Sequence, residues 1–170
     1  MTAIYLSLGS NVERHKNIAA ALDALAILLG ELRISSVYES KSVGFDGSNF
    51  FNLVVGADTD LSIAELSETL KRIEDENGRK RSGPKFSPRT LDIDILTYGN
   101  FVGVEGGVEL PRAEITKNAF VLLPLAEIAP QVLHPQLEKS YSDLWAGYDQ
   151  ASQSLWPIDF EWQGKIISST

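Results

Sequence analysis

Apolar and polar residues alternate along the first hundred positions in a pattern that predicts six elements. Strands are expected at 4–8, 32–38, 50–57 and 91–96, with Gly9-Ser10-Asn11 ending the first. Helices are expected from Lys16 to Leu29, and from the capping box Ser62-Ile63-Ala64-Glu65 to about Gly78. This order predicts an α+β fold with a ferredoxin-like βαββαβ core, in which helices pack on an antiparallel sheet.

The pattern weakens after residue 100 and predicts a C-terminal extension. Gly99-Asn100 is expected to turn the chain into an extended region that reaches Leu110. A helix is expected from Phe120 to Ile128, with Pro124 near an end or at a kink. The tail is expected to cover the core with its tryptophans, Trp145, Trp156 and Trp162.

Composition narrows the class of protein. A chain of 170 residues that is 44% hydrophobic suits one domain, residues 1–170, with a sizeable core. The absence of cysteine excludes a disulfide framework and a cysteine metal site. No apolar run has the length of a membrane span and the N-terminal residues lack the basic region of a signal peptide, so we expect a cytoplasmic protein without membrane contact. The net charge of −8 argues against a nucleic-acid partner.

The charge pattern changes abruptly at residues 79–96. Five of the 15 lysines and arginines, and no acid, lie within residues 79–89, where Gly83, Pro84 and Pro88 predict a loop. In the strand that follows, Asp92 and Asp94 are two residues apart and are therefore expected on one face. Two neighbouring carboxylates suit Mg²⁺, and a cationic loop beside them suits phosphate, so the stretch predicts an Mg-nucleotide site. The alternative is a solvated edge strand beside a solvated charged loop.

Residues 85–96, reading KFSPRTLDIDIL, resemble the signature of the 6-hydroxymethyl-7,8-dihydropterin pyrophosphokinase family. The family pattern is a Gly/Ala-Pro-Arg turn followed by Asp-x-Asp in a hydrophobic strand, and Ser87 stands where the small residue is usual. The resemblance extends from Ile4 to about Pro130. It implies a monomeric enzyme of folate biosynthesis that transfers diphosphate from ATP, its co-substrate, to the hydroxymethyl group of a reduced pterin and releases AMP.

The resemblance also implies roles for individual residues. Two Mg²⁺ ions are expected on Asp92 and Asp94, and the expected catalytic residues are Arg81, Arg89, Asp92 and Asp94. The residues expected to bind ATP are Lys71, Glu74, Arg81, Lys85, Arg89, Ile95 and Arg112. The residues expected to bind the pterin are Ser40, Lys41, Ser42, Val43, Phe50, Asn52, Phe86, Asp92 and Phe120. Without the resemblance, Glu74 is expected to be a solvated helix charge, and Phe50 and Phe120 are expected to be ordinary core residues. For Asn52, pairing with backbone and binding a ligand are equally good interpretations.

Four positions depart from the family pattern. Phe86 stands where a tryptophan is common, Arg112 where a histidine is usual, Ala113 where a larger residue is usual, and Asn118 where an arginine is usual. An arginine still suits phosphate, because its guanidinium is a bidentate donor. These departures leave open a paralogue of the same fold that acts on another pterin or turns over slowly. A non-enzymatic RNA-binding module of ferredoxin-like fold is the second alternative.

Overall fold

The computed structural model describes residues 1–41, 48–78 and 91–170. In the first two thirds of the chain the elements are β1 (Thr2–Ser10), α1 (Arg14–Leu29), β2 (Arg33–Ile34), β3 (Tyr38–Ser40), β4 (Phe50–Thr59), α2 (Ile63–Glu76), β5 (Asp92–Tyr98), β6 (Gly103–Glu105) and β7 (Val108–Leu110). The remaining elements are α3 (Glu114–Lys117), α4 (Ala119–Ile128), α5 (Tyr141–Ala146), β8 (Leu155–Pro157), β9 (Phe160–Trp162) and β10 (Lys165–Ser168).

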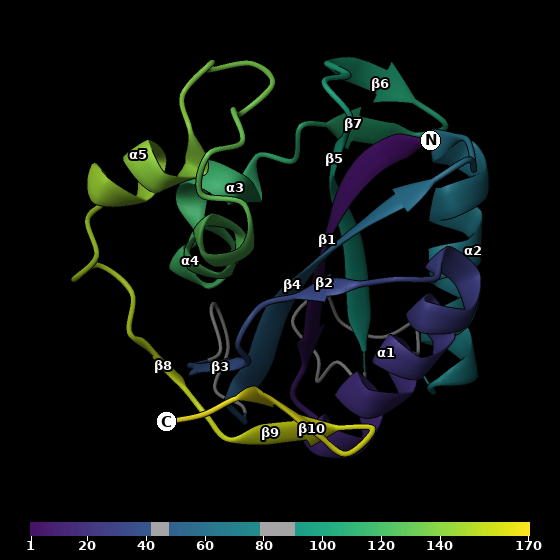
Figure 1. Cartoon of the computed structure of the whole chain (residues 1–170), viewed down its shortest axis with the longest axis vertical. Coiled ribbons are helices and arrows are strands. Elements are labelled where there is room, and N and C mark those ends of the chain that lie inside the picture. The colour runs from purple at the N-terminus through teal and green to yellow at the C-terminus, as the bar shows by residue number, and fades with distance from the viewer. Residues whose placement is uncertain (42–47, 79–90) are drawn as a thin grey trace.

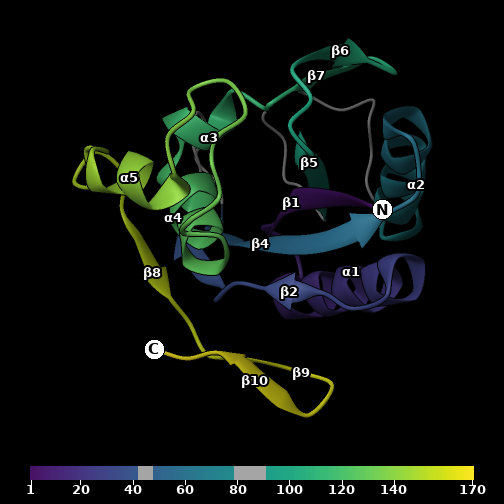
Figure 2. The same ribbon diagram turned by 45° about the horizontal axis from the view of Figure 1, so that its top comes forward.

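The main sheet is antiparallel and has the strand order β5-β1-β4-β3-β8, with β2 also paired to β4. Helices α1 and α2 lie on one side of it, and α3, α4 and α5 lie on the other (Figure 1). The turned view separates these layers and shows the β9–β10 hairpin beyond α1 (Figure 2). The expected α+β class is therefore correct.

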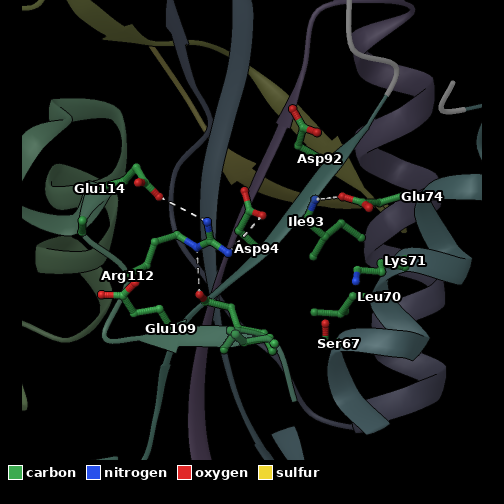
Figure 3. Close-up of a pocket in the computed structure, with 14 residues that line it drawn as sticks. Ser67, Leu70, Lys71, Glu74, Asp92, Ile93, Asp94, Glu109, Arg112 and Glu114 are labelled. Carbon is green, nitrogen blue, oxygen red and sulfur yellow. Dashed lines mark hydrogen bonds and ion pairs between the residues drawn. The ribbon is translucent and has the colours of Figure 1, made fainter. Parts of the chain in front are cut away.

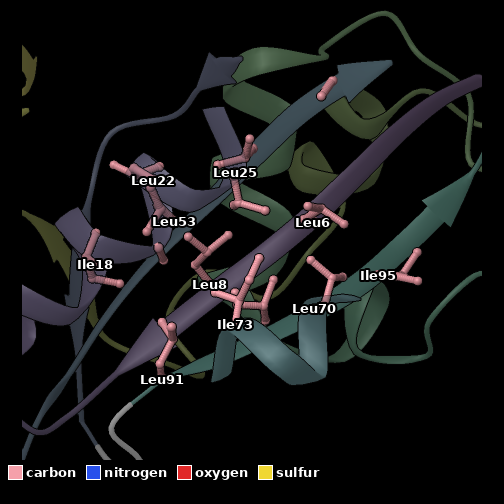
Figure 4. Close-up of a cluster of buried hydrophobic side chains, with 14 of the residues drawn as sticks. Leu6, Leu8, Ile18, Leu22, Leu25, Leu53, Leu70, Ile73, Leu91 and Ile95 are labelled. Carbon is pink, nitrogen blue, oxygen red and sulfur yellow. The ribbon is translucent and has the colours of Figure 1, made fainter. Parts of the chain in front are cut away.

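Each face of the sheet has its own hydrophobic cluster, because side chains alternate along the strands. On β1, Leu6 and Leu8 point toward α1 and α2 (Figure 4), and both belong with Ile4 to the larger cluster. Tyr5 points the other way, into the smaller cluster around α4. Both clusters contain fully buried leucines, so the sheet is a packed middle layer that holds the residues at its edges in fixed positions.

The first strand is longer than expected. Gly9 was expected to end it, but β1 continues to Ser10. Gly9 pairs with Asn52 of β4 on one side and with Asp92 of β5 on the other. A Cβ at Gly9 would lie 3.5 Å from Asn52 Oδ1, so the missing side chain keeps this part of the sheet surface open between its neighbours.

The strand expected at 32–38 is two short strands, β2 and β3. Ser35 separates them, and its Oγ accepts a hydrogen bond of 2.9 Å from the Val54 N–H. The backbone N–H of Ser35 also donates to the Val54 carbonyl at 3.0 Å. A side-chain hydroxyl thus replaces a backbone carbonyl in the ladder, which sequence periodicity does not reveal.

The second helix begins at the expected capping box. Ser62 Oγ accepts from the Glu65 N–H at 3.1 Å, and Glu65 Oε1 accepts from the Ser62 N–H at 2.9 Å. The extended region after residue 100 is the β6–β7 hairpin, whose Gly106-Gly107 turn has φ values of 58° and 78°. Positive φ at both central residues suits glycine and fits a two-residue hairpin turn.

The C-terminal part differs in part from expectation. The helix expected from Phe120 to Ile128 is α4, and Pro124 lies inside it, so of the two positions expected for this proline the one near an end is wrong, while a kink stays a prediction. Trp145 and Trp162 pack against the two clusters as expected, but Trp156 on the outer strand β8 is 38% exposed, so the prediction that it covers the core is wrong. Strand β8 pairs with β3 at the margin of the sheet, where Trp156 stands opposite Glu39. No helix among the described residues is long and apolar enough to cross a membrane.

Candidate active site

Asp92 and Asp94 lie on the edge strand β5 and share one face, as expected. Both are partly exposed, whereas the intervening Ile93 is 4% exposed and Ile95 is 3% exposed. The opposite edge of β5 pairs with β1, so the outer edge is free of strand partners in the described sheet. The two carboxylates therefore stand at the accessible margin of a rigid layer.

Glu74 of α2 holds this outer edge. Its side chain is buried, and its Oε2 accepts a 2.7 Å hydrogen bond from the N–H of Ile93, the residue between the two aspartates. The bond is charge-assisted and satisfies a backbone donor that an edge strand would otherwise leave without a strand partner. The alternative interpretation, a solvated helix charge, is wrong, because Glu74 is buried and its carboxylate contacts β5.

Arg112, which follows β7 in the chain, also contacts β5. Its backbone N–H donates to the Leu96 carbonyl at 2.9 Å, and its Nε donates to the Ile95 carbonyl at 3.1 Å. The guanidinium Nη2 lies 3.5 Å from Asp94 Oδ1, and Nη1 lies 3.3 Å from Glu114 Oε2 (Figure 3). Arg112 thus fixes the strand through its backbone contacts and presents a cation beside Asp94.

A pocket of about 750 Å³ lies along this edge. It brings together six residues predicted from the sequence, Lys71, Glu74, Asp92, Asp94, Ile95 and Arg112. Ile95 contributes its backbone, because its side chain is in the core. The pocket also contains residues that the sequence reasoning missed, among them Ser67, Glu109 and Glu114. Ser67 was detectable, since it lies four residues before Lys71 and seven before Glu74 on one helix face.

A second pocket of about 280 Å³ lies between β3, the start of α4 and the segment before β8. Three of the residues predicted to bind the pterin line it, Ser40, Lys41 and Phe120. Asn52 is 6% exposed and adjoins it, because its Nδ2 donates to Ser40 Oγ at 2.8 Å. None of the described residues donates a hydrogen bond to Asn52 Oδ1, so this buried oxygen retains its acceptor capacity.

The strand register connects the two groups of residues. Gly9 pairs with Asp92 on one side and Asn52 on the other, so these three positions lie in a row across β5, β1 and β4. Directly paired residues point to the same face, which is the face that α4 covers. Adjacent strands are about 4.8 Å apart, so the backbones of Asp92 and Asn52 are roughly 10 Å apart.

Six predicted site residues lie outside the described residues. They are Ser42, Val43, Arg81, Lys85, Phe86 and Arg89. Their assignment remains a prediction from the sequence.

The donor set suits Mg²⁺. Within residues 1–41, 48–78 and 91–170, no group of three or more histidine, cysteine, aspartate or glutamate side chains is arranged to hold a metal. Mg²⁺ in nucleotide sites commonly takes one or two protein carboxylates and completes its shell with phosphate and water, and Asp92 and Asp94 provide such a pair.

The fold matches that of known structures. Over 98% of its length the chain resembles the crystal structure of Plasmodium falciparum HPPK-DHPS, with a TM-score of 0.70 and 15% sequence identity. The chain spans 50% of that protein's length. This likeness shows the fold, an α+β domain.

Sequence comparison then identifies the family. A model of the 7,8-dihydro-6-hydroxymethylpterin-pyrophosphokinase (HPPK) family matches residues 5–130. The 2-amino-4-hydroxy-6-hydroxymethyldihydropteridine pyrophosphokinase of Aquifex aeolicus is 42% identical over 141 residues, covering 82% of this chain and 88% of the relative. The protein of the same name from Porphyromonas gingivalis is 37% identical over 142 residues, covering 80% and 96%. The chain belongs to the HPPK family, and it is a pyrophosphokinase, an ATP-dependent diphosphotransferase of folate biosynthesis.

Proposed function

We propose that this protein transfers the diphosphate group of ATP to the hydroxymethyl oxygen of 6-hydroxymethyl-7,8-dihydropterin and releases AMP. The hydroxyl oxygen of the substrate forms a bond to the β-phosphorus and releases its proton to solvent. The bond from that phosphorus to the oxygen bridging the α-phosphate breaks, and this oxygen leaves with AMP. The observation that carries the proposal is the row Asp92, Gly9, Asn52, which places a carboxylate suited to Mg-nucleotide and an amide suited to a flat heterocycle on one face of the sheet.

The pocket of about 750 Å³ along β5, here called the large pocket, is the proposed nucleotide site. Asp92 and Asp94 are proposed to hold two Mg²⁺ ions, which when bound supply positive charge to the triphosphate. Lys71 and Arg112 lie in the same pocket and contribute fixed cations. Glu74 keeps β5 in place through Ile93, so the two carboxylates face the phosphates without rearrangement. The cations Arg81, Lys85 and Arg89 are proposed, on the family resemblance, to bind phosphate from the preceding segment.

The pocket of about 280 Å³ beside β3, here called the small pocket, is together with its surroundings the proposed pterin site. Asn52 Oδ1 is a buried acceptor suited to an N–H group on the edge of a pterin. Ser40 and Lys41 lie beside it, and Phe120 at the start of α4 provides an aromatic surface. Phe50 precedes Asn52 on β4 by two residues and so lies on the same face. The family resemblance adds Ser42, Val43 and Phe86 to this proposal.

The organisation of the chain is part of the proposal. The strand order β5-β1-β4-β3 supports a ferredoxin-like core, with residues after about 130 as an extension. We expect residues 1–170 to act as one monomeric domain in the cytoplasm, without a nucleic-acid partner.

Release of AMP tests the reaction and its substrate together. The purified protein should release AMP from Mg-ATP when 6-hydroxymethyl-7,8-dihydropterin is present, with one pterin diphosphate formed for each AMP. Other pterin alcohols, assayed in parallel, should react more slowly. Faster release with a different pterin alcohol would contradict the substrate assignment, and no release with any of them would contradict the proposed function.

A further inference from the structure

The chain beyond the family match contributes one wall of the small pocket. The match ends at residue 130, yet four residues of the later segment line the pocket, Ser152, Gln153, Ser154 and Leu155. This segment runs from α5 past α4 and into β8 (Figure 1). The other residues that line the pocket are Ser40 and Lys41, together with Ala119 and Phe120 of α4.

Gln153 joins this segment to the beginning of α4. Its Oε1 accepts a 2.8 Å hydrogen bond from the N–H of Ala119, the first residue of the helix. Its Nε2 donates to the Lys117 carbonyl at 3.2 Å and to Asn118 Oδ1 at 3.4 Å. Asn118 occupies the N-cap position but makes no capping bond with its side chain. Gln153 therefore caps α4 from 34 positions away in the sequence.

The capped turn is the one that carries Phe120. Two residues after Gln153, Leu155 pairs with Ser40 of β3, so the segment is anchored to the strand as well as to the helix. All four anchored residues line the pocket, so the Gln153 carboxamide links the first residue of α4 to a segment that is itself paired with β3. A change in that link moves the Phe120 ring relative to Ser40 and its hydrogen-bond partner Asn52.

We propose that residues 152–155 form a wall of the pterin pocket and that Gln153 is a positioning residue for Phe120, and hence for pterin affinity. The inference rests on the proposed function, because it concerns the site that takes the pterin. It assigns no contact with the nucleotide, whose pocket lies at the opposite edge of the sheet, along β5.

Gln153→Ala tests the inference through the two Michaelis constants. Loss of a net hydrogen-bond contribution of about 0.5–1.5 kcal/mol at the helix start corresponds to roughly a 2- to 12-fold higher KM for the pterin. The KM for ATP should stay within about twofold. Gln153→Glu keeps an acceptor for the Ala119 N–H, and a negative charge suits a helix N-terminus, so it should recover part of the pterin affinity.

Gln163→Ala is the matched control. Gln163 lies on the same C-terminal extension, and its Nε2 donates at 3.2 Å to Asp23 of α1, away from the small pocket. This variant should keep both Michaelis constants of the wild type. Melting temperatures of all variants identify any loss of folding, and Gln153→Glu serves as the test if Gln153→Ala does not fold.

The possible outcomes distinguish failure of this inference from failure of the proposed function. A higher KM for the pterin alone, partly restored in Gln153→Glu, supports the inference. An unchanged KM for the pterin, or an equal rise in the KM values for the pterin and ATP, overturns the inference. The proposed function is unaffected in that case, provided that the wild type releases AMP. A wild-type protein that releases no AMP with the pterin overturns both.

Discussion

Glu74 offers a sharp test of how the fold supports the two aspartates. Its buried carboxylate makes a 2.7 Å bond to the Ile93 N–H, and Ile93 separates Asp92 from Asp94. Replacement by alanine leaves that N–H without this acceptor. A hydrogen bond to a charged group contributes about 1.5–3 kcal/mol, and the free energy of unfolding should fall by about that amount. For a chain of this size, the loss corresponds to a melting temperature lower by about 3–12 °C.

Activity should fall as well, because β5 carries the proposed metal ligands. At a temperature where both proteins are folded, Glu74→Ala should lose about tenfold or more in kcat/KM for ATP, since small displacements at a reacting centre have large effects on rate. Glu74→Gln retains an oxygen acceptor but not the charge. It should lose roughly half as much stability as Glu74→Ala.

Urea unfolding at pH 7 and AMP release measured on the same preparations provide the assay. Glu68→Ala is the control, because Glu68 lies on the same helix but is exposed. Its stability should stay within about 0.5 kcal/mol of the wild type. If Glu74→Ala is as stable and as active as Glu68→Ala, the bond to Ile93 does not support the site and the reasoning is refuted.

Two further predictions concern charge. Arg112→Ala removes a cation 3.5 Å from Asp94 and should lower kcat/KM for ATP by about tenfold to a hundredfold. Arg112→His should recover part of the activity and make it pH-dependent between about 6 and 7.5. If kcat/KM for ATP is unchanged in both variants, Arg112 has only a structural role. Burial lowers the pKa of His134, whose Nδ1 accepts hydrogen bonds of 3.1 Å from the N–H groups of Gln136 and Leu137. Below about pH 6.5 the unfolded chain therefore binds more protons at His134 than the folded chain does, so the free energy of unfolding should fall as the pH is lowered from 7 to 5. In urea titrations, the part of this fall that comes from His134 should be absent from His134→Asn.

Local patterns were sufficient to predict the α+β class and the shared face of Asp92 and Asp94. Strand side chains alternate with a period of two, so the placement of the two carboxylates follows from their spacing. The capping box at Ser62 was predictable for a similar reason, because its two hydrogen bonds join residues three apart.

Contacts between distant parts of the chain were not predictable in this way. The pairing of Arg112 with Asp94 depends on how the chain returns to β5 after the β6–β7 hairpin. The break between β2 and β3 depends on a hydroxyl of Ser35 that bonds Val54 on another strand. The contact between Gln153 and Ala119 depends on how the tail runs past α4. Such contacts leave no periodic signal in a single sequence.

Asp92→Asn and Asp94→Asn test the central claim, that diphosphate transfer takes place at the edge of β5. Both substitutions keep the size of the side chain and remove a charge that suits Mg²⁺. AMP release from Mg-ATP and 6-hydroxymethyl-7,8-dihydropterin should fall at least about a hundredfold in each variant, since an electrostatic contact at the reacting group contributes about 2.7–4 kcal/mol to catalysis. The melting temperature should stay close to that of the wild type, because both side chains are partly exposed. Near-normal AMP release by either variant would contradict the claim.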